Sequence, residues 1–262
     1  MRIFAPGVLA DRVALITGGA TGLGYAIAHE FAMLGAKVVI ISRKQENLDK
    51  AVAGIKADGG TAIAVQTDVR QYDQVVAAVQ AATSTFGGLD ILVNSAAGNF
   101  YCPTEDMTPN GWRTVVDIDL NGNFLCCKAA FEPLKQSRFQ GRIMMIATSN
   151  SLTGWPGQSH AAAAKAGIIS LSRSLAVEWA KHNIHVNTIS PGPIKDTEGV
   201  TKIYAQRGLA DLQARRVALG RLGESIDVAN AAVYLASPGG NFITGADLIV
   251  DGGRWLNYIA NA

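Results

Sequence analysis

A glycine-rich turn early in the chain is the first pattern whose residue types point to a definite chemistry. The apolar run Val13–Thr17 leads directly into Gly18–Gly24, and the stretch Gly24–Gly35 then carries apolar residues at helical spacing. Glycine lets a ligand approach the backbone closely, and a helix N-terminus offers free N–H groups to a phosphate. Because the turn stands at the first strand–helix junction, we expect it to bind the pyrophosphate of a dinucleotide rather than to be a mere tight turn. The expected contact residues are Gly18, Thr21, Gly22, Leu23 and Gly24.

Two basic residues after the second apolar run bear on which dinucleotide binds. An NAD site usually offers a carboxylate there for the ribose 2′-hydroxyl, whereas this sequence has Ser42, Arg43 and Lys44. Cations suit a 2′-phosphate, which Arg can hold in a forked, charge-assisted geometry. We therefore expect NADPH as the cofactor, bound in part by Arg43 and Lys44. The alternative is a solvated basic turn.

The composition excludes several classes of protein. The chain has 262 residues, with 23 Lys and Arg against 21 Asp and Glu, a formal net charge of +2. That balance argues against a nucleic-acid-coating surface, and 48% apolar with 17% charged residues argues against disorder. Cys102, Cys126 and Cys127 have no metal-ligand spacing and cannot form a disulfide framework. We expect no metal site and a reducing, cytoplasmic location.

No segment predicts a membrane span or a targeting address. Apolar runs such as Val38–Ile41 are far shorter than the roughly 20 residues that cross a bilayer. Met1–Ala10 lacks a long apolar stretch and a cleavage-like site. The residues Ile259–Ala262 differ from the Ser-Lys-Leu type of peroxisomal address. We expect an unprocessed protein without membrane partners.

Short apolar runs alternate with longer helical stretches along the chain. Mostly apolar strands separated by helices imply a parallel sheet covered on both faces, with right-handed crossovers. The expected strands are Val13–Thr17, Lys37–Ser42, Thr61–Gln66, Asp90–Asn94, Gly141–Ile146, His185–Ile189 and Asp247–Val250. The expected helices are Gly24–Gly35, Leu48–Lys56, Val75–Thr83, Thr114–Glu132 and Ala161–His182. We predict one α/β domain over residues 1–262, a doubly wound (Rossmann) sheet of about seven parallel strands.

Several motifs, in the right order along nearly the whole chain, resemble those of the short-chain dehydrogenase/reductase family. They are Thr17-Gly18-x3-Gly22-x-Gly24, Asp68-Val69, Asn94-Ser95-Ala96-Ala97-Gly98, Asn187, Ser190-Pro191-Gly192-Pro193-Ile194 and Asp251-Gly252-Gly253. The resemblance implies that Asp68 and Val69 contact adenine. It implies that Asn94, Ala96 and Gly98 line the cofactor cleft.

The same resemblance extends to the other side of the cleft and to assembly. It implies that Ile194 and Thr197 face the nicotinamide amide, and it adds Pro191 and Gly192 to the cofactor site. Members of the family are mostly homotetramers, so a homotetramer is expected here.

The sequence departs from the family at the catalytic residue. The family's active site is Tyr-x3-Lys with Ser and Asn upstream, and here Ala161 stands in place of the tyrosine while Lys165 is kept. Thr148 falls where the serine would be and Asp119 where the asparagine would be. A methyl group neither donates a proton nor stabilises an oxyanion. Ordinary ketone or alcohol chemistry is therefore expected to be crippled.

One branch of the family shows this pattern, the 2,4-dienoyl-CoA reductases of the peroxisomal type. The similarity rests on Ala97-Gly98-Asn99-Phe100, Cys102-Pro103, Asp117-Ile118-Asp119, His160-Ala161-x3-Lys165 and Thr197-Glu198-Gly199 after Gly192-Pro193-Ile194. In that branch an Asp and a Lys replace the tyrosine-based acid, which implies catalytic roles for Asp119 and Lys165. The mitochondrial type uses a tyrosine just after the fifth strand, where this chain has Asn150 and Ser151.

The implied reaction is NADPH-dependent reduction of a 2,4-dienoyl-CoA to a 3-enoyl-CoA, in the β-oxidation of unsaturated fatty acids. Hydride goes to C5, negative charge spreads to the thioester oxygen, and the proton is delivered to C2. Lys165 would hold the nicotinamide ribose hydroxyls, and Asp119 would orient or protonate a water. A nearby Lys lowers a carboxyl pKa while burial raises it, so the protonation state of Asp119 is not fixed by the sequence. Asn99 and Phe100 are expected to position the thioester and the acyl chain, and Ile203–Arg216 to cover that chain.

Each of these roles has a plainer alternative. Asp119 is otherwise a carboxylate bonded to Lys165 or to the backbone, Thr148 a cap of the strand end, and Asn99 with Phe100 an ordinary loop. His160 is a possible substitute acid, because its unperturbed pKa of about 6.5 suits one. Its position about 100° around the helix from residue 161 favours a structural histidine.

Two rival functions follow from the missing tyrosine. The first is another short-chain reductase, acting on a keto- or enoyl-thioester with His160 or Tyr101 as the acid. The second is a catalytically silent NADPH-binding sensor or scaffold, against which the retained Lys165 argues.

Overall fold

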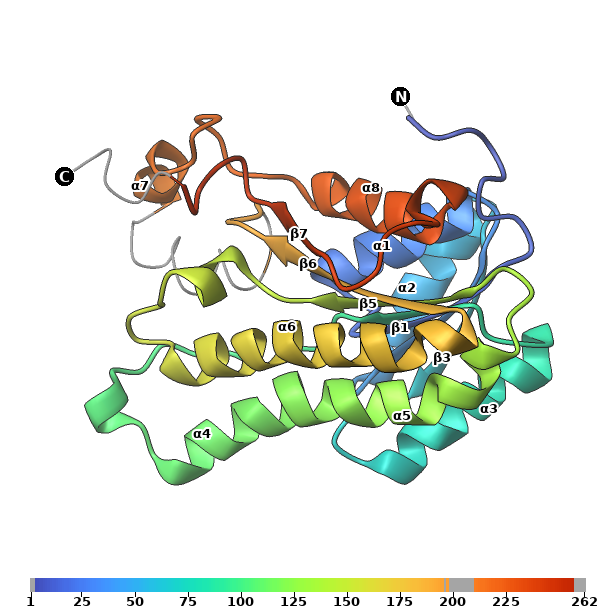
Figure 1. The fold of residues 1–262 in the computed structure, drawn as a ribbon, viewed down its shortest axis with the longest axis horizontal. Coiled ribbons are helices and arrows are strands. Elements are labelled where there is room, and N and C mark those ends of the chain that lie inside the picture. Colours follow the sequence, from blue (N-terminus) through green and yellow to red (C-terminus); the bar gives the residue numbers. More distant parts are fainter. Residues whose placement is uncertain (1–2, 196, 198–209, 257–262) are drawn as a thin grey trace.

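The computed structural model describes residues 3–195, 197 and 210–256 of the chain and builds them around one parallel sheet (Figure 1). The sheet has seven strands in the order β3-β2-β1-β4-β5-β6-β7. The strands are β1 (Val13–Thr17), β2 (Lys37–Ser42), β3 (Thr61–Gln66), β4 (Ile91–Asn94), β5 (Gly141–Ile146), β6 (Ile184–Pro191) and β7 (Asp247–Val250). All six neighbouring pairs are parallel. The predicted doubly wound fold with seven strands is confirmed.

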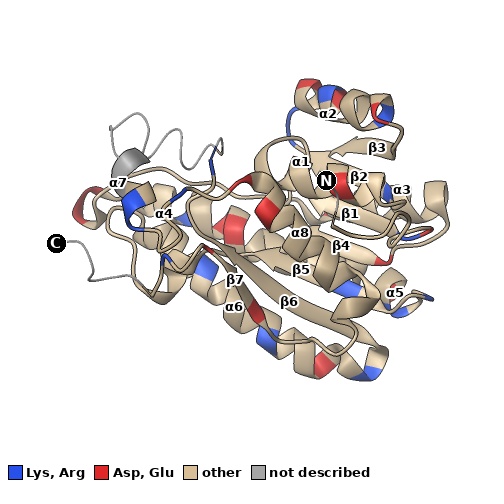
Figure 2. Ribbon diagram, turned by 90° about the horizontal axis from the view of Figure 1, so that it is seen from above, with Lys and Arg blue, Asp and Glu red and all other residues tan. Residues whose placement is uncertain are grey.

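Alternate residues of the central strands enter two separate cores, because side chains of a strand point to opposite faces. In β1, Ala14 and Ile16 belong to one buried cluster, and Val13 and Leu15 to the other. The strands are therefore apolar on both faces, as in a parallel sheet with helices on both sides. Most Lys, Arg, Asp and Glu residues lie instead on helices and connecting loops (Figure 2).

Helices cover both faces of the sheet (Figure 1). One layer contains α1 (Gly22–Met33), α2 (Gln45–Ala57) and α8 (Ser225–Ala236). The other contains α3 (Tyr72–Phe86), α4 (Pro109–Val116), α5 (Gly122–Lys135) and α6 (Ser159–Trp179). The short helix α7 (Ala210–Arg215) lies between β6 and α8 in the chain. No described helix is long and apolar enough to span a bilayer.

The expected elements differ from the observed ones at two places that matter. Helix α8 was not expected, although its buried alanines and valines pack on the sheet. The expected helix Thr114–Glu132 is a longer composite of α4, a π-helical turn η2 (Asp117–Asn121) and α5. Smaller differences are that β4 begins at Ile91 and that β6 extends to both sides of His185–Ile189.

Candidate active site

The candidate site lies at the carboxyl ends of the central strands. The chain runs outward from β1 to β3 on one side and from β4 to β7 on the other, so the strand order reverses between β1 and β4. Ligands of open parallel sheets bind at such a switch point. The loops after β1, β4, β5 and β6 meet there and carry about half of the residues expected from the sequence, while Asp119 lies on η2 and Lys165 on α6.

The glycine turn has the geometry that a phosphate-binding loop requires. Gly18 and Gly22 have φ values of +63° and +54°, a region that favours glycine. A Cβ on Gly18 would lie 3.0 Å from the backbone of Ala96, so the loops after β1 and β4 approach closely. Helix α1 begins at Gly22, and the side chain of Thr21 makes no cap hydrogen bond to its first turn. This cradle of backbone N–H groups fits a pyrophosphate.

Thr17 fixes these two loops against each other, a role that the sequence analysis did not assign. Its Oγ1 accepts hydrogen bonds from the N–H groups of Ser95 and Ala96, each at 2.9 Å. The side chain of Asn94 turns the other way and donates to the carbonyl of Asn123 and to Cys127 Sγ, both at 3.4 Å. Asn94 therefore ties β4 to α5 in this structure, and its contact with a cofactor stays a prediction.

The adenine end of the expected cofactor site is rich in charge. Asp68 is held by Arg70, whose Nε and Nη2 donate three hydrogen bonds of 3.0, 3.1 and 2.5 Å. These bonds, together with the nearby charge of Arg43, lower the pKa of Asp68. Arg43 and Lys44 are exposed at the end of β2, and the Arg43 carbonyl accepts a 2.8 Å hydrogen bond from Gln66. Arg70 was missed because nothing in its spacing marks it as a partner of Asp68.

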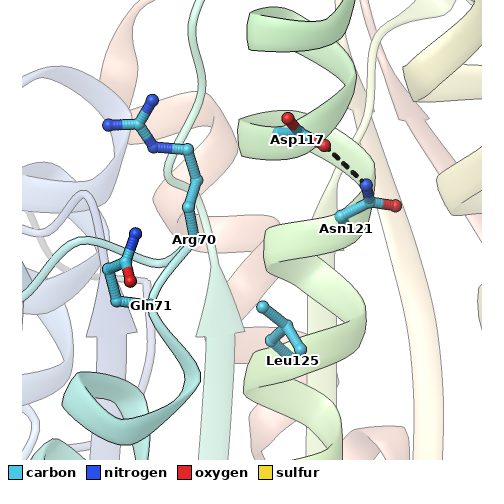
Figure 3. Close-up of a pocket in the computed structure, with 5 residues that line it drawn as sticks. All are labelled: Arg70, Gln71, Asp117, Asn121 and Leu125. Carbon is cyan, nitrogen blue, oxygen red and sulfur yellow. Dashed lines mark hydrogen bonds between the residues drawn. The ribbon is translucent and has the colours of Figure 1, made fainter.

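A cavity of about 500 Å³ adjoins Arg70 (Figure 3). Gln71 lies beside Arg70 on one wall, and Asp117, Asn121 and Leu125 form the facing helical wall. Asn121 donates a 2.8 Å hydrogen bond to Asp117 Oδ1 within that wall. None of the expected catalytic residues lines this cavity, so it is separate from the candidate catalytic centre.

Asp119 sits at the middle of the π-helical turn η2. The Gly122 N–H bonds the Asp117 carbonyl five residues back, one residue farther than in an α-helix. The carbonyl of Asp119 accepts a 2.6 Å hydrogen bond from the side chain of Asn123, which is itself buried. Such a turn inserts one residue into the helix, so it changes the direction of the side chains around it.

The carboxylate of Asp119 is buried and faces Lys165. It is 1% exposed, and its Oδ1 accepts a 2.7 Å hydrogen bond from the Gly98 N–H. Its Oδ2 lies 3.5 Å from Lys165 Nζ, and Nζ donates a 2.8 Å bond to the Ile146 carbonyl at the end of β5. Burial raises the pKa of Asp119, while the Lys165 charge and the Gly98 hydrogen bond act against that rise.

Ala161 and Thr148 are the remaining residues of the expected catalytic centre. Ala161 is 1% exposed and lies one helical turn before Lys165, so a buried methyl stands where the family has a phenol. Thr148 Oγ1 accepts a 3.4 Å hydrogen bond from the Asn150 N–H and caps the following 3₁₀ turn. The capping alternative therefore describes Thr148 in this structure, and its contact with substrate stays a prediction.

His160 is fully buried at the start of α6. Its ring meets Phe100 edge-on, with 4.6 Å between centroids and planes at 73°. Neither ring nitrogen has a hydrogen-bond partner of good geometry within the described part of the chain. Burial lowers the pKa of His160, while the Gln158 backbone and the Asp119 carboxylate act the other way.

The loop after β4 is fastened to the segment that leads into α6. Asn99 donates to the side chain of Gln158, the Cys102 N–H bonds the Gly157 carbonyl at 2.8 Å, and Thr104 bonds Ser159 at 3.0 Å. Tyr101 packs against Gly157, where a Cβ would collide with its ring. Asn99 and Phe100 are therefore held in place beside the catalytic centre. These cross-links were not visible in the sequence.

The loop after β6 forms the opposite side of the site. Gly192 bonds the Val250 carbonyl through its N–H at 3.0 Å, and Ile194 is 3% exposed. Thr197 Oγ1 donates a 2.8 Å hydrogen bond to the Ile194 carbonyl. Of the segment Ile203–Arg216 that we expected to cover an acyl chain, residues 203–209 lie outside the described residues.

Comparison with known proteins gives a consistent set of relatives. A family model described as enoyl-(acyl carrier protein) reductase matches residues 18–254. The chain is 40% identical to a peroxisomal 2,4-dienoyl-CoA reductase, (3E)-enoyl-CoA-producing, of Arabidopsis thaliana, over 97% of this chain and 88% of that protein. It is also 40% identical to a probable 2,4-dienoyl-CoA reductase, (2E)-enoyl-CoA-producing, of Bacillus subtilis, over 94% and 97%. A crystal structure of a short chain dehydrogenase from Bacillus anthracis superposes with a TM-score of 0.88 at 39% identity, over 94% of this chain and 97% of that one.

Proposed function

The chain belongs to the short-chain dehydrogenase/reductase family, and we propose that it reduces 2,4-dienoyl-CoA thioesters to 3-enoyl-CoA with NADPH. One observation carries the proposal: Asp119 and Lys165 face each other in a buried centre that holds the methyl of Ala161 instead of a phenol. The names of the relatives support the same substrate class.

The buried methyl disfavours reduction of a simple ketone. That reaction places the proton on oxygen, next to the carbon that receives hydride, and it needs a hydroxyl at the Ala161 position. A dienoyl thioester differs because its negative charge spreads from C4 through C2 to the thioester oxygen. The final proton then goes to carbon, at a place that a donor on another element can reach.

The residues around the glycine turn fit a bound NADPH, which supplies the hydride to C5 of the substrate. Gly18 and the first turn of α1 would hold its pyrophosphate, and Arg43 with Lys44 its 2′-phosphate. Lys165 would hold the ribose hydroxyls of the nicotinamide half and place positive charge near the thioester. Ile194 and Thr197 would contact the nicotinamide amide.

Asp119 would control the delivery of the proton to the substrate. Burial raises the pKa of its carboxyl group and favours the protonated form, which can donate. Lys165 opposes this, and the carboxyl group would act directly or through a water that it orients. Delivery to C2 yields a 3-enoyl-CoA, whereas delivery to C4 would yield a 2-enoyl-CoA. The two relatives are named for these two different products.

The test is a comparison of thioesters with the purified protein. NADPH oxidation is followed with 2,4-hexadienoyl-CoA, crotonyl-CoA and acetoacetyl-CoA, and the position of the remaining double bond is determined by NMR. We expect turnover of the dienoyl thioester alone and a 3-enoyl product. Turnover of acetoacetyl-CoA in preference to the dienoyl thioester would refute the proposal, and NADPH binding without any turnover would favour the silent sensor.

Cofactor choice is tested at the end of β2. The double variant R43A/K44A removes both cations, so kcat/KM for NADPH should fall about tenfold to a hundredfold, the size of one or two charge-assisted hydrogen bonds. The value for NADH should change little. The control is K50A, which removes an exposed cation of α2 that pairs with Glu46. Equal losses for NADPH and NADH in R43A/K44A would contradict recognition of the 2′-phosphate.

The assembly belongs to the same proposal. We expect a homotetramer, as is common in the family, and exposed apolar side chains on α4, α5 and α6 are available for contacts between copies: Trp112, Phe124 and Val177. Light scattering coupled to size-exclusion chromatography measures the mass directly. A monomer at micromolar concentration would contradict this expectation.

A further inference from the structure

Gln158, at the start of α6, departs from the usual residue preference of a helix end. It is the N-cap residue of α6, a position where Ser, Thr, Asp and Asn are preferred because their side-chain oxygen accepts a hydrogen bond from the first turn. The Gln158 side chain makes no such bond, and the residue is only 1% exposed. Departures from local preference are expected where function requires them. The buried amide group of Gln158 therefore needs an explanation other than capping.

The partner of Gln158 in the structure is Asn99, in the loop after β4. Gln158 Oε1 accepts a hydrogen bond from Asn99 Nδ2, which is the side-chain hydrogen bond that the described residues give to Asn99. Asn99 itself is exposed, so a ligand can reach the rest of its amide group. An amide nitrogen carries two N–H groups, and one of them stays free here. The pair therefore consists of a buried acceptor and an accessible donor.

The main chain beside this pair is also fixed. The Cys102 N–H bonds the Gly157 carbonyl at 2.8 Å, which joins the loop after β4 to the segment before α6. Phe100 packs edge-on against His160, with 4.6 Å between ring centroids. These contacts hold the backbone of Asn99 but leave its side-chain torsions free. The hydrogen bond to the buried amide fixes those torsions as well.

Asn99 lies next to the residue expected to deliver the proton. The N–H of Gly98 donates a 2.7 Å hydrogen bond to Asp119 Oδ1. Asn99 directly follows Gly98, so its Cα is about 3.8 Å from the Cα of Gly98. The free amide N–H of Asn99 is therefore presented beside the Asp119 carboxyl group.

Gln158 lies next to the position of the missing phenol. Gln158, Ala161 and Lys165 are separated by three and four residues, the spacing of neighbours on one helix face. Ala161 and Lys165 are both buried residues of α6. Gln158 thus precedes the Ala161 methyl by about one turn on the face of α6 that carries Lys165.

The proposed reaction needs a hydrogen-bond donor in this region. Hydride addition at C5 moves negative charge onto the thioester oxygen, and the methyl of Ala161 cannot stabilise it. The proton goes to C2, which is bonded to the thioester carbonyl carbon, so the oxygen lies only two bonds from the atom that Asp119 serves. A preorganised N–H aimed at that oxygen would lower the barrier.

We infer that Gln158 positions Asn99 so that the free N–H of Asn99 donates a hydrogen bond to the thioester oxygen of the substrate. This inference rests on the proposed dienoyl-CoA reductase activity and adds an oxyanion site to it. Gln158 acts through Asn99 and is a positioning residue. Neither side chain gains or loses a proton, because the hydrogen bond only strengthens as negative charge develops on the oxygen.

The first test is Q158S. Serine is a preferred N-cap residue, so the stability should be unchanged or higher, but its side chain is too short to reach Asn99. With 2,4-hexadienoyl-CoA we expect kcat to fall about tenfold to a hundredfold, less than the roughly 10²–10³-fold loss expected for N99A, which removes the donor itself. The Kd for NADPH should stay at the wild-type value in both variants.

The double variant N99A/Q158S separates positioning from a general structural role. If Gln158 acts through Asn99, its loss has no further effect once Asn99 is gone, so the double variant should be as active as N99A. A structural residue would instead lower kcat by the same factor in both backgrounds.

A spectroscopic measurement avoids turnover altogether. The ¹³C-labelled thioester carbonyl of 2,4-hexadienoyl-CoA is observed by infrared difference spectroscopy in the complex with the protein and NADP⁺, in which no reduction occurs. The C=O stretch should lie at a lower frequency in the wild type than in N99A or Q158S, because a hydrogen bond to the oxygen weakens the C=O bond.

A matched control is available at the amino end of the sheet. Gln140 Oε1 accepts a 2.8 Å hydrogen bond from Arg142 Nη2, so Q140S removes a comparable amide anchor far from the catalytic centre. We expect Q140S to be less stable than the wild type, with normal kcat and an unchanged C=O stretch.

Three results would overturn the inference: a wild-type kcat in folded Q158S, losses that multiply in N99A/Q158S, and a C=O stretch that N99A does not change. If Q158S does not fold, Q158M, which keeps the side-chain length but lacks the acceptor oxygen, is measured in the same way. Failure of the wild-type protein to reduce the dienoyl thioester would refute the proposed function instead, so the two failures are distinguishable.

Discussion

The two ends of the parallel sheet each bury a group of charged side chains, and the two groups differ in how their hydrogen bonds are completed. At the amino ends of β1, β4, β5 and β6 lie Arg12, Asp90, Arg142 and His185. At the carboxyl ends lie Asp119, His160 and Lys165. Both groups contain buried charged side chains, Arg142 in one and Asp119 in the other, so burial alone does not distinguish them.

The amino-end group is nearly fully bonded. Asp90 accepts from the Val13 N–H at 2.8 Å and from Ser137 Oγ at 2.5 Å. Arg142, 1% exposed, bonds His185 Nδ1 at 2.6 Å. Its other partners are Gln140 Oε1, the Gly240 carbonyl and Asn241 Oδ1. Among the fully buried side-chain atoms of this group in the described residues, only Nε of Arg142 lacks a partner.

The carboxyl-end group is left incomplete. Both ring nitrogens of His160 lack a hydrogen bond of good geometry in the described part of the chain, whereas Asp119 Oδ2 forms a 3.5 Å ion pair with Lys165 Nζ. A buried polar atom without a partner costs about 1–3 kcal/mol, so a purely structural cluster would be expected to satisfy it. The difference indicates that the amino-end group stabilises the fold. The carboxyl-end group instead leaves buried polar atoms available for the reaction.

The sharpest test of this comparison is D119N. The amide can still accept from the Gly98 N–H, so the fold should survive, but the carboxyl group that handles the proton is lost. We expect dienoyl-CoA turnover to fall about 10²–10⁴-fold, the usual contribution of a positioned acid or base, with an unchanged or higher melting temperature. The matched control is D117N, two residues earlier and exposed, which should retain activity. Full turnover in D119N would show that Asp119 has no catalytic role.

The opposite result is expected from R142M at the amino end. Loss of the guanidinium leaves the buried Gly240 carbonyl and three partly buried acceptors without a donor, so the free energy of unfolding should fall by about 2–4 kcal/mol. Turnover per folded molecule should stay at the wild-type value, because the side chain lies at the far end of the sheet. Urea denaturation and an assay at low temperature measure the two effects. A large loss of kcat with unchanged stability would reverse our assignment of the two ends.

Between these extremes lies N123A. Asn123 completes the hydrogen bonding of the π-helical turn through the Asp119 carbonyl. We expect both a moderate loss of stability, about 1–2 kcal/mol, and a roughly tenfold fall in kcat, because a misplaced Asp119 is a poorer donor. N110A, on the exposed start of α4, is the control. If stability alone changed, the turn would contribute to the fold and not to the orientation of the Asp119 side chain.

The smallest expected effect is the pH dependence of stability contributed by His185. Burial and the Arg142 charge lower its pKa in the folded state, so the unfolded chain binds more protons below about 6.5. Stability is therefore full above that pH and declines as the pH falls toward the folded-state pKa. Urea midpoints from pH 7.5 to 5 should decline less steeply in H185Q than in the wild type. An identical slope in both proteins would show that His185 does not contribute to the pH dependence of stability.

The local pattern of the sequence predicted most of the strands and helices of the fold. Five of the seven strands begin and end where they were predicted, because apolar runs of strand length are bounded by turns and polar residues. Helix α8 was not predicted, although its buried residues recur at helical spacing: Val228, Ala229, Ala232, Val233 and Ala236. The π-helical turn was not predicted, because it inserts one residue into the helix and nothing in the residue types indicates the insertion.

What the sequence by itself determined is the set of chemical groups: a glycine turn for a pyrophosphate, cations after β2, and Asp119, Lys165 and an alanine in the catalytic region. Only the tertiary structure decided how these groups are arranged. It brought Asp119 within 3.5 Å of Lys165, joined Arg70 to Asp68, and enclosed His160 beside Phe100 without a hydrogen-bond partner that the described residues provide. The physical reason is that residue identity and local periodicity are properties of neighbours in the chain. Burial, pairing and the pKa of a group depend on elements that are distant in the chain and meet only when the sheet is assembled.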